Sequence, residues 1–252
     1  MRTMTKRMIC TVLVLGVWCL MSGARAGESP KKDGDAGALK AKQEQRAPDQ
    51  YGFIMDWLVL LDPIPLPELS PLPFRESSAD KEFFPGMKVC TPKEGDTVKL
   101  DNNLVETFWK TNAFSTKPIP DVVRTWKAIH SETFRIHFPP RHNSLYLSVT
   151  YITCAADISD AKLKTGSGDF SVWLLNGKEI IRAVKNGKAT IIDENVSEPV
   201  TLKKGVNVLM AENINCYGGD TGLCARFVDK DDKPVTNIKV SLTPPTSGMS
   251  PK

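Results

Sequence analysis

The sequence lacks long apolar runs and the common catalytic motifs. Its longest apolar run, residues 9–20, falls short of the roughly 20 residues that a membrane-spanning helix needs. It contains no G-x-S-x-G elbow, H-E-x-x-H helix, P-loop or Rossmann fingerprint. Nothing in the pattern places two carboxylates at a glycosidase separation either. We therefore expect a protein that is not an enzyme and has no transmembrane segment in its mature chain.

The N-terminus has the pattern of a signal peptide. Arg2, Lys6 and Arg7 precede the apolar run, and Ala24-Arg25-Ala26 is an A-x-A cleavage site. Residues 1–26 are therefore predicted to direct export, which makes the mature protein secreted or periplasmic. A retained signal anchor is the alternative.

The mature chain has no excess of basic charge. Residues 1–26 hold four basic and no acidic residues, so the formal net charge falls from +4 to zero without them. A nucleic-acid partner would need a basic surface to neutralise phosphates. We therefore expect no nucleic-acid partner.

Cysteine is scarce and never occurs in a C-x-x-C pair, which argues against a zinc or redox site. Of six cysteines, two belong to the signal peptide. The four that remain are an even number in an exported chain, which predicts two disulfides. A short loop between antiparallel strands favours Cys216 with Cys224. Cys90 and Cys154 would then pair or stay reduced.

The rest of the chain divides into a tether, one domain and a tail. Residues 27–50 are small and charged without an aromatic residue, which predicts a disordered tether. Residues 244–252 are predicted to be a disordered tail. Between them, short extended runs recur with turn residues, as in an all-β sandwich or barrel. The predicted strands of domain 51–243 are residues 53–61, 97–100, 106–109, 124–129, 133–138, 145–156, 161–165, 170–175, 178–183, 200–202, 206–215, 222–228 and 238–242.

Residues 166–180 (GSGDFSVWLLNGKEI) predict a β-hairpin. Asn176-Gly177 favours a type I′ turn, because both residues tolerate positive φ. Residues 170–175 carry apolar side chains on both faces, which predicts a central strand packed on both sides. The predicted core comprises Trp57, Val149, Tyr151, Val172, Leu174, Val208 and Met210.

Five segments resemble one family. They are residues 56–65 (DWLVLLDPIP), 149–153 (VTYIT), 166–178 (GSGDFSVWLLNGK), 202–210 (LKKGVNVLM) and 222–229 (GLCARFVD). In this order the chain resembles exported bacterial modules with a galactose-binding-domain-like jelly roll, which overlap in motif with lectin-like modules of the protective-antigen type. The resemblance spans residues 51–235 and implies a jelly-roll β-sandwich. It does not specify a ligand.

The resemblance bears on calcium through Asp169. In the calcium-dependent lectin relatives the G-S-D-D-G segment supplies an acidic pair that ligates the ion. Here the segment reads GSGDF, and Asp169 is its single carboxylate. Calcium requires six to eight oxygen ligands, so calcium is possible but not favoured, and no other cofactor is expected. Asp169 is expected instead to accept backbone N–H bonds and order the bend.

Aromatic residues indicate where a sugar would bind, because sugar-binding sandwiches stack pyranose rings on Trp or Tyr. Trp57 and Trp173 lie in the strongest strands and are expected in the core. The loop at residues 216–222 (CYGGDTG) places an aromatic residue beside a carboxylate, although it is also typical of a crosslinked hairpin loop. The candidate ligand-binding residues are Tyr217, Asp220, Trp109 and Trp126.

Two functions fit these patterns. The first is a non-catalytic exported binding module, with an extracellular glycan as its partner. The second is a structural or protein-interaction β-sandwich without a small-molecule site, whose partner would be a cell-surface protein. The missing acidic pair favours the second, and the family resemblance favours the first.

Overall fold

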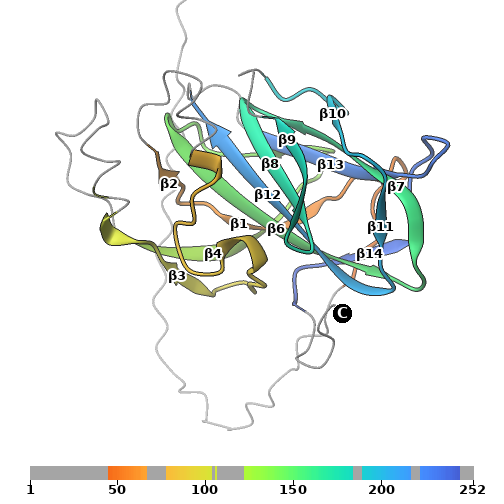
Figure 1. The fold of residues 1–252 in the computed structure, drawn as a ribbon, viewed down its shortest axis with the longest axis horizontal. Coiled ribbons are helices and arrows are strands. Elements are labelled where there is room, and N and C mark those ends of the chain that lie inside the picture. The colour runs from red at the N-terminus through yellow and green to blue at the C-terminus, as the bar shows by residue number, and fades with distance from the viewer. Residues whose placement is uncertain are drawn as a thin grey trace, which may run out of the picture. The chain divides into compact units, whose positions relative to one another are not determined.

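The protein folds as an all-β structure with two antiparallel sheets, as predicted (Figure 1). This computed structural model describes residues 45–66, 78–103, 106, 122–183, 189–216 and 222–244. No helix among these residues is long and apolar enough to cross a membrane.

The larger sheet has nine strands and is centred on β6 (Ser144–Cys154) and β12 (Gly205–Asn215), which pair along their whole length. Its main strand order is β3-β4-β1-β6-β12-β8-β9, and β2 and β14 also pair with β6. The other strands are β1 (Asp56–Leu60), β2 (Ile64–Pro65), β3 (Thr97–Lys99), β4 (Val123–His130), β8 (Phe170–Leu175), β9 (Lys178–Ala183) and β14 (Ile238–Ser241).

The smaller sheet has five strands in the order β10-β7-β13-β5, and β11 also pairs with β7. Its centre is β7 (Ile158–Ser167) paired with β13 (Gly222–Val228). The short strands are β5 (Ile136–His137), β10 (Asn195–Val196) and β11 (Val200–Leu202). The strands that follow β6 and β12 in the sequence, β7 and β13, belong to this smaller sheet. Strands that are consecutive in the sequence therefore lie in different sheets at these two points.

The main core lies between the two sheets. Trp57 and Trp173 from the larger sheet are fully buried, and their rings meet edge to face at 6.1 Å. Leu163, Ala225 and Phe227 from the smaller sheet belong to the same cluster. The prediction that both tryptophans belong to the core is confirmed.

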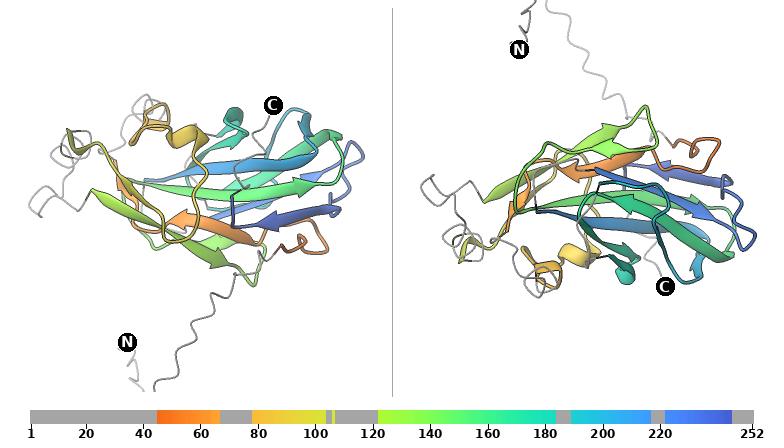
Figure 2. Two further views of the ribbon diagram at one scale, coloured as in Figure 1. Left: turned by 90° about the horizontal axis from the view of Figure 1, so that it is seen from below. Right: turned by 90° about the horizontal axis from the view of Figure 1, so that it is seen from above.

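A second core covers the other face of the larger sheet. Residues 78–96, which precede β3 and which we call the cover segment, include the short 3₁₀ helix η1 (Met87–Val89) and are yellow in Figure 2. Phe83, Phe84 and Met87 from this segment join Val172 and Met210 in one buried cluster. Because both faces of the larger sheet are covered, every residue of β8 is buried, which confirms the predicted central strand.

The β8–β9 hairpin has the predicted turn. Asn176 and Gly177 have φ angles of 52° and 78°, as a type I′ turn requires. The Asn176 side-chain oxygen accepts a hydrogen bond from the Val208 N–H at 2.8 Å, which ties the turn to β12. Six of the seven predicted core residues are buried, and Val208 is half-buried at the margin of the second core.

The predicted tether, residues 27–50, overlaps the folded domain at its C-terminal end. Arg46 forms an antiparallel bridge with Val240, and Pro48 is buried. Residues 45–50 therefore pack on the fold, because their backbone groups find partners beside β14. The predicted strand at residues 106–109 lies outside the described residues except for Glu106, which is helical.

The predicted disulfides are not formed. All four remaining cysteines lie in the described part of the chain, and none is joined to another. Cys216 and Cys224 do not face each other across a hairpin, because β12 and β13 belong to different sheets. Cys90 packs against the second core, whereas Cys154 belongs to the core between the sheets. Burial raises the pKa of Cys90 to about 12 and that of Cys224 to about 11.

Candidate binding surface

The structure removes Trp126 from the ligand-binding candidates. Its side chain is 1% exposed and packs in the second core. Its backbone N–H and C=O bond to Asp96 and Gly95 of the cover segment, which holds the ring under that segment. The other three candidates, Trp109, Tyr217 and Asp220, lie outside the described residues.

Asp169 has the structural role that its position predicts. Its backbone is left-handed at φ 54°, and its Oδ2 accepts the Cys216 N–H at 2.7 Å. The carboxylate therefore joins the bend before β8 to the end of β12. Among the described residues, no group of three or more His, Cys, Asp or Glu side chains is placed to hold a metal ion.

The smaller sheet instead presents a polar and aromatic surface around Arg226 of β13. Successive strand residues point to opposite faces, and Ala225 and Phe227 point into the core. Arg226 is therefore on the outer face, with its side chain 19% exposed. On one side its strand pairs with β7, and on the other Phe53 forms an isolated bridge with Arg226 itself.

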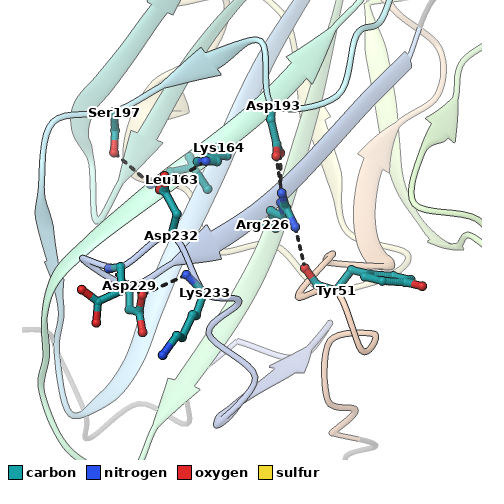
Figure 3. Close-up of polar contacts among 10 residues, drawn as sticks. Tyr51, Leu163, Lys164, Asp193, Ser197, Arg226, Asp229, Asp232 and Lys233 are labelled. Atoms are coloured by element: carbon teal, nitrogen blue, oxygen red, sulfur yellow. Dashed lines mark hydrogen bonds and ion pairs between the residues drawn. The ribbon is translucent and has the colours of Figure 1, made fainter.

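The Arg226 guanidinium is held in place from two directions (Figure 3). Its Nε donates to Asp193 Oδ1 at 3.0 Å, and its Nη2 donates to Asp193 Oδ2. Its Nη1 donates to the Tyr51 carbonyl at 3.1 Å. The hydrogen bonds and charge of Asp193 raise the pKa of Arg226. This bidentate pair fixes both the charge and the direction of the remaining donors.

Two exposed aromatic residues belong to the chain around this ion pair. Tyr51 is 58% exposed and Phe134 is 40% exposed. Phe53 links Phe134 to the ion pair, because its ring lies 5.0 Å from the Arg226 guanidinium and 5.6 Å from the Phe134 ring. Tyr51 is linked through its backbone carbonyl, which accepts the hydrogen bond from Arg226. We call Tyr51, Phe53, Phe134, Asp193 and Arg226 the Arg226 surface.

Local hydrogen bonds position the tyrosine. Asp49 Oδ1 accepts the backbone N–H groups of Tyr51 and Phe53, at 3.0 and 2.7 Å. This turn leaves the Tyr51 ring extending away from Arg226 (Figure 3). The surface therefore has an apolar ring at one end and a fixed ion pair at the other.

Further charges continue the surface along the sheet. Lys164 of β7 is the in-register partner of Arg226, and its Nζ lies 3.2 Å from Asp232 Oδ1. Asp232 belongs to a turn in which Asp229 accepts the Lys233 N–H at 2.9 Å. These backbone hydrogen bonds lower the pKa of Asp229. This face thus presents both hydrogen-bond donors and hydrogen-bond acceptors.

The sequence contained partial signals for this surface. Alternation along residues 222–228 places Arg226 on the face opposite Leu223, Ala225 and Phe227. Alternation along the predicted strand 133–138 would place Phe134 on the buried face with Ile136, but β5 is only two residues long. The Ser131 and Thr133 hydroxyls bond the Arg135 carbonyl and turn the preceding chain, which leaves Phe134 exposed. His137 is exposed, as its alternation predicts.

Comparisons with known proteins leave the family open. No family model matches the chain, and no curated protein matches it. A solved beta-glucosidase from Kluyveromyces marxianus is similar over 44% of this chain, with 16% identity and a TM-score of 0.33. The same enzyme in complex with glucose is similar over 62% of the chain, with 13% identity and a TM-score of 0.33. The similar region spans only 15% and 19% of those two chains.

Proposed function

We propose that this protein is a non-catalytic exported binding module and that its Arg226 surface binds carbohydrate. The observation that carries the proposal is that two exposed aromatic residues, Tyr51 and Phe134, surround a fixed Arg226–Asp193 ion pair, Tyr51 through its carbonyl and Phe134 through Phe53. Aromatic faces stack on the apolar face of a sugar ring, and Arg and Asp bond its hydroxyls.

Preorganisation supports this proposal. Arg226 is held by Asp193 and by the Tyr51 carbonyl before any ligand arrives. A ligand therefore does not have to order a long side chain, which would reduce its affinity. The Tyr51 ring extends away from the ion pair (Figure 3), so an extended ligand is suited to contact the ring and the ion pair together. The proposed ligand is an oligosaccharide.

A protein partner is the second candidate function. Ile191, Ile192 and Val196 are 52%, 42% and 49% exposed, and they lie on either side of Asp193 in the chain. Exposed apolar groups that gather at one place are typical of protein contacts. This patch borders the Arg226 surface through Asp193. Loss of binding on substitution of Tyr51 would therefore favour carbohydrate, and loss on substitution of Ile192 would favour a protein partner.

A glycan array followed by titration calorimetry distinguishes them. We expect the full chain to bind at least one class of oligosaccharide, and Tyr51→Ala to weaken that binding about fivefold, since one stacked ring contributes roughly 1 kcal/mol. Tyr51→Phe keeps the ring and should keep most of the affinity. Val89→Ala, which changes an exposed residue of the cover segment, is the matched control.

The proposal fails if the array is blank, or if Tyr51→Ala binds as tightly as wild type. A blank array together with a purified cell-surface protein whose binding is lost on Ile192→Asp would favour the second candidate.

A further inference from the structure

A carboxyl group is buried on the covered face of the larger sheet. Glu212 of β12 is 0% exposed. Its in-register neighbours are Leu147 of β6 and Val172 of β8, and both belong to the second core. Met210 and Ile214, two residues away in the strand, belong to the same cluster. Because strand side chains alternate, Glu212 points to the same side, toward the cover segment.

Neither oxygen of Glu212 has a hydrogen-bond partner. Buried polar groups almost always have one, because an ionised carboxylate loses its water on burial and gains nothing in return. A neutral carboxylic acid is far less costly to bury. The placement of Glu212 is therefore compatible with its protonated form and not with its charged form.

Charged groups from two elements face this carboxyl. The cover segment contributes Asp80 and Lys88, and β9 contributes Glu179 and Arg182. Arg182 is already engaged, because Nε bonds Glu179 at 2.8 Å and Nη2 bonds Asp80 at 2.8 Å. Burial raises the pKa of Glu212 to about 8, even though Lys88 and Arg182 act to lower it.

We propose that Glu212 is a pH-sensitive switch that keeps the cover segment on the larger sheet while its carboxyl group is protonated. When the proton passes to solvent, the buried charge has no partner in the closed arrangement. Separation of the cover segment from the sheet gives the carboxylate access to water and breaks the Asp80–Arg182 contact. This inference does not rest on the proposed function, because Glu212 lies in the larger sheet and the Arg226 surface in the smaller one.

Hydrogen exchange of individual amides tests the proposal, with rates corrected to protection factors. The reporters are the Gly95 and Trp126 N–H groups, whose hydrogen bonds join the cover segment to β4 of the larger sheet. The reference amides are Ile54 and Val235, which bond to β13 of the smaller sheet. If opening exposes Glu212, reporter protection should fall about tenfold per pH unit between pH 6 and pH 8, and then level off.

Two isosteric variants make the test specific. Glu212→Gln cannot ionise, so its reporter protection should not change with pH. Glu198→Gln makes the same change at an exposed position of the smaller-sheet side and should behave as wild type. The proposal is overturned if wild-type reporters keep constant protection across this range, or if Glu212→Gln retains the pH dependence. It is also overturned if the reference amides show the same fall, because the opening is then global.

If Glu212→Gln does not fold, the carboxyl carbon of Glu212 can be followed by NMR in the wild-type protein. A titration midpoint near 8, at the pH where reporter protection levels off, supports the switch. A midpoint near the ordinary glutamate value would overturn it, because the group would then be ionised while the cover segment is closed.

Discussion

Replacement of Glu212 by glutamine should make the folding stability of the protein less dependent on pH. In the unfolded chain this carboxyl titrates near its usual value of 4.5, whereas in the folded protein burial raises its pKa to about 8. Between these values the unfolded state releases the proton more readily, so the wild-type protein loses stability as pH rises. Below pH 4.5 both states are protonated and the loss disappears.

The magnitude follows from the pKa difference. One pKa unit corresponds to about 1.4 kcal/mol. Through this carboxyl group, the folding stability of the wild-type protein is therefore about 3 kcal/mol lower at pH 7 than at pH 4. This is an upper bound, because opening of the cover segment would relieve part of the buried charge. The glutamine amide is also buried without a partner, but that cost is the same at both pH values.

The assay is urea unfolding of wild type and Glu212→Gln at pH 4 and pH 7, with Glu198→Gln as the control. When the pH is raised from 4 to 7, the free energy of unfolding of Glu212→Gln should increase by about 3 kcal/mol relative to that of wild type. An equal difference at both pH values would refute the reasoning, because Glu212 would then have the same pKa in the folded and unfolded states.

Two further predictions concern the hairpin. Asp169→Ala removes the acceptor of the Cys216 N–H and should lower stability by about 1 kcal/mol. Melting curves with and without calcium check this, and a strong calcium-dependent rise of the wild-type midpoint that the variant loses would make Asp169 an ion ligand instead. Leu174→Ala should lower the free energy of unfolding by about 2–5 kcal/mol, because the side chain is 3% exposed in the second core. Urea unfolding measures it, and a change below about 0.5 kcal/mol would mean that the β8–β9 hairpin is peripheral.

Local sequence patterns predicted the strands well, because alternation and turn chemistry act over a few residues. The Asn176-Gly177 turn and the doubly buried β8 follow from such patterns alone. The sequence did not indicate what covers the larger sheet, since the cover segment is largely irregular and packs through scattered aromatic residues. For that reason Trp126 was expected to be available to a ligand, although it lies beneath that segment.

The candidate surface was harder to predict than the fold. Arg226 meets Asp193 and Tyr51 across 33 and 175 residues of sequence, so no local pattern connects them. Cysteine pairing failed for a similar reason, because the link after β12 crosses to the other sheet. Glu212 did leave a local signal, since a single carboxylate interrupts the apolar face formed by Met210 and Ile214.

The most direct test of the central claim is NMR chemical-shift mapping with the oligosaccharide that binds most strongly on the array. The account predicts that the largest shifts occur at Tyr51, Phe134 and Arg226, and that residues of the larger sheet shift little. Shifts that centre on residues 217–221, or no shifts at saturating ligand, would contradict the assignment of carbohydrate binding to the Arg226 surface.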